Sequence, residues 1–280
     1  MTLLTARYWV DGSESETVPI DDRGLNYADG LFETILCVNG KMRCESLHLE
    51  RLQDGLCKLH FAEFNDIAKN FMDAASNIVK WVGHTGLARL TITRGSGLRG
   101  YSPPPSVNAR WILGLYPEPV AGHIALDCIV ANTRWAEQSC LAGLKLLGRT
   151  EQVLAANEAV LAGAQDSIML DQNGMVISSS KGNLFGFMTD HFITPDLERC
   201  GIAGTRRRLL IEKVCPSLSI PVEICPMTLD DLMACSELMI CNTVIGIIPV
   251  ASVGNRFWDD AVVSEMLAEK FNHAVRTCDV

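Results

Sequence analysis

The sequence has little of what marks nucleic-acid-binding, secreted or membrane proteins. Its 24 basic residues are outnumbered by 33 acidic ones, the net charge is −9, and the longest basic run is Arg206-Arg207-Arg208. Nucleic-acid affinity depends on clustered positive charge, so this balance argues against a nucleic-acid partner. The N-terminal residues also lack the basic-then-apolar order of a signal peptide.

Long apolar runs and paired cysteines are missing too. The most apolar stretch, 238–253, is interrupted by Asn242, Thr243, Gly246 and Pro249, so we interpret it as buried strand and turn and expect no membrane span. The 11 cysteines are odd in number and include no CxxC pair. We therefore expect reduced, mostly buried thiols, no metal site and a cytoplasmic location.

The remaining composition indicates a globular protein with a sizeable core. Apolar residues make up 48% and charged residues 20% of the 280 positions, enough for one large or two moderate domains. A Pro/Gly-rich segment near 117–122 is typical of a linker. We expect an N-terminal α/β domain at 1–116 and a C-terminal α/β domain at 123–280.

Periodicity and turn signals predict mixed α/β structure in both halves. The first half should begin with a hairpin at 7–19 and a loop at 21–30. Two helices follow, with apolar stripes Leu49-Leu52-Leu56-Leu59 and Ile67-Phe71-Ala74-Ile78. The other expected strands are 31–38, 86–94, 109–115, 123–132, 166–171, 174–178, 183–189, 221–224 and 237–241; the other expected helices are 149–163, 205–214, one from 228 and one from 259.

One lysine, Lys145, lies in the apolar run 141–147, just before a helical pattern. Burial lowers the pKa of a lysine, and a neutral amine can attack a carbonyl, so Lys145 is a Schiff-base candidate. The alternative is a lysine with a buried stem and a solvated ammonium group.

A glycine-bracketed turn, Gly201-Ile-Ala-Gly204-Thr-Arg206, opens a helix and could bind a phosphate with its free amide groups, or be an ordinary connection. Thr243 could add a hydroxyl to the same anion, or simply end a strand. The inward-facing Arg51 also requires an anion, which could be a phosphate or a structural salt-bridge partner.

These motifs, in order along nearly the whole chain, resemble those of the fold-type IV pyridoxal-phosphate enzymes. The resemblance is carried by residues 22–34, 48–52, 145, 183–185 and 204–206. Within that family, which includes branched-chain and D-amino acid aminotransferases, residues 93–102 and 144–154 look most like aminodeoxychorismate lyases. The resemblance implies an α/β (α+β) fold with a smaller N-terminal sandwich, a larger barrel-like C-terminal domain, pyridoxal 5'-phosphate between them and a homodimer.

The resemblance also implies roles for individual residues. Lys145 would be the Schiff-base lysine. Thr34 would line the substrate side, where its hydroxyl, or Lys145 itself, would protonate the leaving group. The cofactor would further contact Arg51, Ser178, Asn183, Thr205, Arg206 and Thr243. The substrate, a small dianion, would contact Tyr27, Phe32, Arg99, Tyr101 and Arg149; for Arg99 the alternative is a solvated loop residue.

Two positions depart from the family pattern. Ser178 stands where a glutamate usually pairs with the protonated pyridine nitrogen, and Gly148 stands where related lyases often have asparagine. A serine should favour the protonated ring much less than a carboxylate does. The weaker electron sink favours elimination over transamination, so we expect conversion of 4-amino-4-deoxychorismate to 4-aminobenzoate and pyruvate for folate synthesis. The alternatives are an aminotransferase for D-amino or branched-chain acids and a weakened cofactor-binding homologue.

Overall fold

The computed structural model describes residues 5–97, 99–103, 108–118 and 125–278, which fall into two compact units. Unit 1 comprises Met1–Val120, Leu144–Gly148 and Cys278–Val280, and unit 2 comprises Ala121–Gly143 and Arg149–Thr277. Contacts thus group the segment around Lys145 with the first unit, although we expected all of 123–280 in the second domain. Most of the predicted linker, 119–122, lies outside the described residues, so the exact domain boundary stays a prediction.

Unit 1 is built on an antiparallel sheet of six strands in the order β2-β1-β6-β5-β3-β4. The predicted hairpin at its start is confirmed, because Asp11 and Gly12 both take positive φ angles between β1 and β2. The strands are β1 (Arg7–Val10), β2 (Ser13–Glu14), β3 (Gly30–Val38), β4 (Lys41–Met42), β5 (Gly86–Thr93) and β6 (Arg110–Tyr116).

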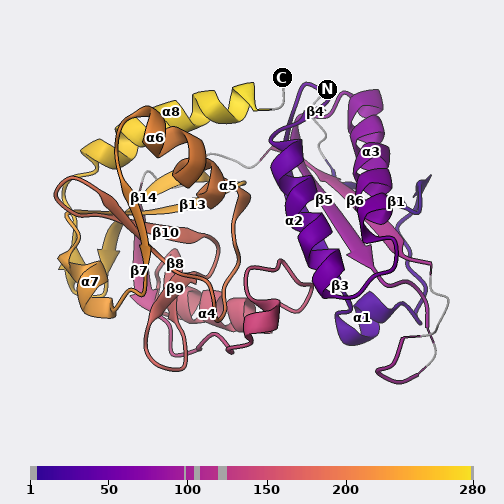
Figure 1. Cartoon of the computed structure of the whole chain (residues 1–280), viewed down its shortest axis with the longest axis horizontal. Coiled ribbons are helices and arrows are strands. Elements are labelled where there is room, and N and C mark those ends of the chain that lie inside the picture. Colours follow the sequence, from indigo (N-terminus) through magenta and orange to yellow (C-terminus); the bar gives the residue numbers. More distant parts are fainter. Residues whose placement is uncertain (1–4, 98, 104–107, 119–124, 279–280) are drawn as a thin grey trace. The chain divides into compact units, whose positions relative to one another are not determined.

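Helices α2 (Glu45–Lys58) and α3 (Phe64–Val82) lie side by side over one face of this sheet (Figure 1). A Cβ on Gly55 of α2 would come within 2.6 Å of the Leu31 side chain, so glycine permits this close packing. The apolar stripe predicted for α3 is one residue off: the buried positions are Ala68, Met72, Ala75 and Val79. The predicted residues flank this stripe, since apolar side chains cover a wide arc of the helix and only contact with the sheet selects its centre.

The expected loop at 21–30 contains a short helix, α1 (Arg23–Tyr27). Asp22 caps it, accepting hydrogen bonds from the amides of Gly24 and Leu25, and Ala28 ends it in the left-handed conformation. The prediction of an irregular loop was wrong because a capped single turn needs no apolar periodicity to form.

Unit 2 contains a mixed sheet of nine strands whose main path is β12-β11-β10-β13-β14-β7-β8-β9, with β15 paired to β14. The last strand of this order, β9, leads directly into β10, and the Ser179 amide donates to the carbonyl of Gly182 in the connection, so the sheet curls on itself. The strands are β7 (Leu126–Val130), β8 (Asp166–Leu170), β9 (Val176–Ser179), β10 (Asn183–Phe187), β11 (Phe192–Pro195), β12 (Val222–Cys225), β13 (Glu237–Asn242), β14 (Gly246–Val253) and β15 (Arg256–Phe257).

Helices cover parts of this sheet. The α4 helix (Thr150–Leu161) packs on β8, and α8 (Val262–Thr277) packs on β13 and β14. Helix α5 (Thr205–Leu209) continues through a π-helical turn, η2 (Leu210–Val214), into α6 (Cys215–Ser217). The helix expected from 228 is confirmed as α7 (Leu229–Ala234), which a capping box of Thr228 and Asp231 opens.

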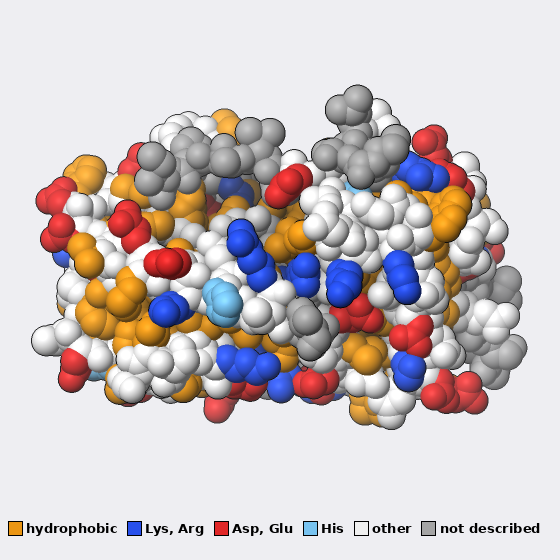
Figure 2. All heavy atoms as spheres, turned by 90° about the horizontal axis from the view of Figure 1, so that it is seen from above, with side chains coloured by type: hydrophobic (Ala, Val, Ile, Leu, Met, Phe, Trp, Pro, Cys, Tyr) orange, Lys and Arg blue, Asp and Glu red, His pale blue; other side chains and the backbone are white. Residues whose placement is uncertain are grey.

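The surface carries side chains of both charges (Figure 2), and most of the cysteines lie in the interior. Acidic and basic side chains both lie among apolar and other side chains on the face drawn in Figure 2. Among the described helices, none is long and apolar enough to cross a bilayer. No two described cysteines form a disulfide, and most of the eleven are buried.

Candidate active site

The backbone around Lys145 is held as a short strand against the start of β3. The Phe32 amide donates to the Lys145 carbonyl over 3.0 Å, the Leu147 amide donates to the Gly30 carbonyl over 3.1 Å, and Leu146 pairs with Leu31. These bonds use the edge of β3 that β4 leaves unpaired. They fix the direction of the Lys145 side chain, which is half-buried with its Nζ 4.3 Å from the centroid of the Phe32 ring.

The face of the sheet that carries Phe32 is opposite to the helix-covered face. Arg89 in β5 lies over the same ring, its Cζ 3.8 Å from the centroid, and stands opposite Thr34 in the strand register. We call Phe32, Thr34, Arg89 and Lys145 the lysine face. Two basic side chains, those of Lys145 and Arg89, therefore lie over one aromatic ring within unit 1, where an anionic substrate would be attracted.

Arg89 is a residue that the sequence reasoning missed. It is half-buried, and the ion pairs among the described residues do not include it. Burial lowers the pKa of its guanidinium, while the nearby Tyr116 phenol acts in the opposite direction. The available signal was the alternation of strand 86–94, which turns Arg89 towards one face of the sheet, where burial of a charge is costly unless it has a partner or a ligand.

Two tyrosines extend this environment across the sheet. Tyr8 and Tyr116 pack edge to face with centroids 5.9 Å apart, and Gly114 beneath them stands opposite both Tyr8 and Arg89. A Cβ at Gly114 would lie 2.8 Å from the Tyr116 ring, so the glycine makes room for it. Burial and the hydrogen bond to Tyr8 raise the pKa of Tyr116, and the charge of Arg89 lowers it by a smaller amount.

On the helix-covered face, Glu33 binds Arg51. Glu33 Oε1 accepts from Arg51 Nε over 2.8 Å, and Glu33 Oε2 lies 2.6 Å from His48 Nδ1. Burial alone would raise the pKa of the Glu33 carboxyl, but the charges of Arg51 and His48 and their hydrogen bonds lower it to about 2. The structure therefore shows the salt bridge that we considered for Arg51, with a partner the sequence did not identify; phosphate binding by Arg51 stays a prediction.

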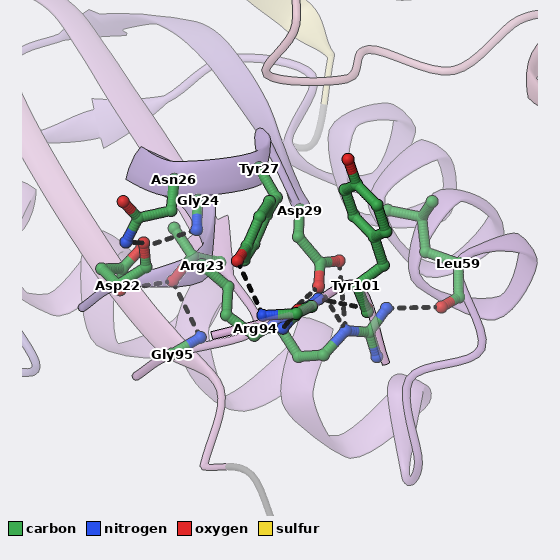
Figure 3. Close-up of polar contacts among 12 residues, drawn as sticks. Asp22, Arg23, Gly24, Asn26, Tyr27, Asp29, Leu59, Arg94, Gly95 and Tyr101 are labelled. Atoms are coloured by element: carbon green, nitrogen blue, oxygen red, sulfur yellow. Dashed lines mark hydrogen bonds and ion pairs between the residues drawn. The ribbon is translucent and has the colours of Figure 1, made fainter. Parts of the chain in front are cut away.

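A second ionic network holds the loop after β5 (Figure 3). Asp29 accepts hydrogen bonds from both Arg23 and Arg94. The Arg23 guanidinium in turn donates to the carbonyls of Gly100 and Tyr101 over 3.0 and 2.7 Å. These contacts fix the backbone at Gly100 and Tyr101, which lie outside the helices and strands of the described residues.

The predicted substrate residues of this region lie at its surface. The Tyr27 hydroxyl accepts a hydrogen bond from the Gly100 amide over 2.9 Å, and its ring packs against Tyr101 with centroids 5.7 Å apart. Tyr101 is 87% exposed, and Arg99 is exposed as well. Within unit 1 the structure brings Phe32, Thr34 and Lys145 together, and it places Tyr27 at the end of α1 against Tyr101 of the exposed loop that also carries Arg99.

In unit 2, the turn before α5 is braced by Asn183. Its Nδ2 donates to the Ile202 carbonyl over 2.9 Å, and a Cβ on Gly204 would lie 2.1 Å from its Oδ1. Gly204 is therefore needed for close approach, and the Asn183 amide shapes the turn that leads into Thr205 and Arg206.

The side chains that follow this turn are buried donors. Arg206 is 2% exposed, and neither of its terminal guanidinium nitrogens has a hydrogen-bond partner among the described residues. The Thr205 hydroxyl is buried and unsatisfied in the same way. Since a buried, uncompensated charge is strongly unfavourable, these groups fit a bound anion.

Thr243 lies in the turn between β13 and β14, half-buried. Asn242 shapes this turn, because its Oδ1 accepts from the amides of Val244 and Ile245 over 2.8 Å each. The register pairs Asn183 with Cys241, two residues before Thr243. The turn that carries Thr243 and the start of β10 therefore lie at the same ends of two neighbouring strands.

The remaining predicted residues of unit 2 meet around Trp135. Its Nε1 donates to Ser178 Oγ over 3.0 Å, and the Arg149 Cζ lies 5.7 Å from its ring centroid. Burial lowers the pKa of Arg149, against the charge of Glu151. Trp135 was not predicted, since a lone tryptophan in an irregular stretch carries no pattern.

The chain is similar to known proteins over most of its length. The Amino-transferase class IV family matches residues 30–253. The aminodeoxychorismate lyase of Vibrio harveyi is 32% identical over 88% of this chain and 91% of that protein. A putative branched-chain-amino-acid aminotransferase of Methanocaldococcus jannaschii is 28% identical over 94% of this chain and 92% of its own length.

Solved structures agree on the fold. The 4-amino-4-deoxychorismate lyase from Pseudomonas aeruginosa has a TM-score of 0.87 and 34% identity, covering 95% of this chain and 98% of that one. The branched-chain aminotransferase of Escherichia coli has the same TM-score of 0.87 at 22% identity, which supports the fold alone. The expected mixed α/β, fold-type IV architecture is thereby confirmed, and the chain belongs to the aminotransferase class IV family.

Proposed function

We propose that this protein is a pyridoxal-phosphate-dependent lyase that converts 4-amino-4-deoxychorismate to 4-aminobenzoate and pyruvate. The carrying observation is the lysine face: a backbone-fixed lysine shares one aromatic ring with Arg89, a half-buried cation outside the ion pairs of the described residues. A reactive lysine amine beside an arginine that can bind a carboxylate suits a small substrate that carries both an amine and a carboxylate. The similarity to lyases named for this substrate supports the assignment.

The residues present fit the cofactor by their donor chemistry. The unsatisfied Thr205 hydroxyl and Arg206 guanidinium, with the amides that open α5, would hold its phosphate in unit 2. Lys145 would hold it covalently, and Ser178 would contact its ring. When bound, pyridoxal phosphate supplies an aldehyde for the lysine amine and a ring that accepts electrons.

Lys145 then acts on the substrate as a general base. Its amine takes the proton from the ring carbon that bears nitrogen, and the C–H electron pair forms the new ring double bond as the neighbouring C–O bond breaks. The departing oxygen takes the C–O electron pair and a proton, which Thr34 or the protonated Lys145 would provide. The product leaves as the enol, which tautomerises to pyruvate. Phe32 keeps water from one side of the amine, because its ring lies directly beneath it.

Arg89→Met is expected to raise KM by roughly 10- to 150-fold, with a smaller effect on kcat, because a charge-assisted hydrogen bond to a substrate carboxylate is lost. Arg89→Lys should recover part of the loss, since it keeps the charge but not the bidentate geometry. Steady-state kinetics at constant ionic strength would measure both.

The matched control is Arg7→Met. Arg7 also lies over an aromatic ring of the same sheet, Trp9 at 4.8 Å, but it is paired with Glu14. Its loss should leave KM unchanged. Equal KM values for Arg89→Met and the wild type would remove Arg89 from substrate binding.

The function itself is tested by incubating cofactor-loaded protein with 4-amino-4-deoxychorismate and following 4-aminobenzoate fluorescence and pyruvate together. One equivalent of each per substrate consumed is expected. Absence of both products from protein that demonstrably carries cofactor would refute the lyase assignment.

The second candidate is an aminotransferase, which the resemblance to branched-chain and D-alanine aminotransferases supports. The same preparation separates the two, because an aminotransferase converts its cofactor to the amine form with an amino acid alone. Ser178, which offers no carboxylate for a protonated ring, favours the lyase.

A further inference from the structure

Ser178 and Trp135 form a buried polar pair in apolar surroundings. Trp135 Nε1 donates to Ser178 Oγ over 3.0 Å, and the two residues are 6% and 4% exposed. Ser178 stands opposite Met169 in the sheet, and Met169, Ile177 and Trp135 belong to one apolar cluster. The serine hydroxyl is therefore held from one side by a donor.

The hydrogen-bond capacity of the hydroxyl then restricts its second partner. A serine oxygen has one proton to donate and two lone pairs to accept with, and Trp135 takes one lone pair. Within the described part of the chain, Trp135 is the hydrogen-bond partner of Ser178 Oγ. The hydroxyl proton is left to donate, and a buried donor without an acceptor is costly.

The side chains around Trp135 also favour a hydrogen-bond acceptor as the second partner of Ser178. The Arg149 Cζ lies 5.7 Å from the centroid of the Trp135 ring, and its Nε and Nη1 are buried without described hydrogen-bond partners. Gln152 Nε2, one helical turn along α4, is a further buried donor without a described partner. Buried donors without described partners are satisfied by an acceptor, and the Arg149 charge disfavours a second cation nearby, although the charge of Glu151 partly offsets it.

We propose that Trp135 orients the Ser178 hydroxyl so that it donates to an unprotonated pyridine nitrogen of the bound cofactor. This inference rests on the proposed function for the presence of pyridoxal phosphate. Trp135 is a positioning residue, since it acts through Ser178. A neutral ring withdraws electrons less than a protonated one, which favours rapid loss of a neighbouring leaving group over the slower proton shifts of amino transfer.

Nitrogen-15 NMR of protein loaded with ring-labelled cofactor tests this directly, because a neutral pyridine nitrogen resonates far downfield of a pyridinium. The wild type should show the neutral, hydrogen-bonded signal. Ser178→Ala should move it further downfield, to the value of a nitrogen without a donor, and Trp135→Phe should move it in the same direction. Ser178→Glu should move it upfield, into the pyridinium range.

The matched control is Trp258→Phe, which removes another buried indole donor of unit 2, bonded to the Cys235 carbonyl over 2.8 Å. It should leave the signal at the wild-type position. A pyridinium signal in the wild type, or equal signals in Trp135→Phe and Trp258→Phe, would overturn the inference while leaving the lyase function intact. Absence of any bound-cofactor signal would instead refute the proposed function, and this inference with it.

Discussion

Lys145→Ala is expected to abolish covalent attachment of the cofactor and to lower turnover by about 10⁴-fold, because in the proposed function one side chain would serve both as the attachment point and as the general base. The loss should come from chemistry and leave folding intact. The hydrogen bonds that hold this segment to β3 run through the backbone of residues 30, 32, 145 and 147 and survive truncation of the side chain.

Borohydride reduction followed by intact-mass measurement reads out the attachment independently of activity. The wild type should gain the mass of one reduced cofactor, whereas Lys145→Ala should gain none. Lys145→Arg, which keeps the charge over the Phe32 ring, should also gain none. Lys69→Ala is the control, since Lys69 lies at the surface of α3 in a pair with Asp73 and should behave as the wild type. A gain of the full cofactor mass by Lys145→Ala would refute Lys145 as the attachment residue.

Glu33→Gln is expected to lower the free energy of unfolding at neutral pH by about 3–5 kcal/mol, the usual cost of breaking a buried ion pair. Glu33 is 1% exposed and bridges Arg51 on one side and His48 on the other. The amide keeps the volume of the side chain but removes the charge that both partners face.

The effect should depend on pH in a defined direction. The pKa of Glu33 is lowered from 4.5 to about 2 in the folded protein, so its stabilisation, about 3 kcal/mol, is present above the unfolded pKa and lost as pH falls towards 2. The difference in stability between wild type and Glu33→Gln should be largest above pH 5 and shrink on acidification.

Urea unfolding of both proteins across this pH range would measure the difference. Glu14→Gln removes an exposed salt bridge with Arg7 in the same unit and should change stability little at any pH. A gap between wild type and Glu33→Gln that is constant with pH would show that packing, and not the carboxylate charge, carries the contribution of Glu33.

The sequence was most informative where a local rule sets the structure. The hairpin expected at 7–19 turns at Asp11–Gly12, and the helix expected from 228 begins with a capping box of Thr228 and Asp231; each depends on a few neighbouring residues, and each is confirmed. Periodicity found helix α3 but misplaced its buried stripe by one residue, because several arcs of that helix are apolar and only the sheet selects one.

By itself the sequence determined the α/β class, the family motifs and the chemical types available to the site, since these follow from local patterns and residue identities. Only the tertiary structure decided which groups meet. It paired Arg51 with Glu33, brought Arg89 to the ring beneath Lys145 and directed Trp135 at Ser178. The partners in these contacts are separated by 18, 57 and 43 positions along the chain. Sheet register and helix packing bring them together, and no short stretch of sequence encodes either.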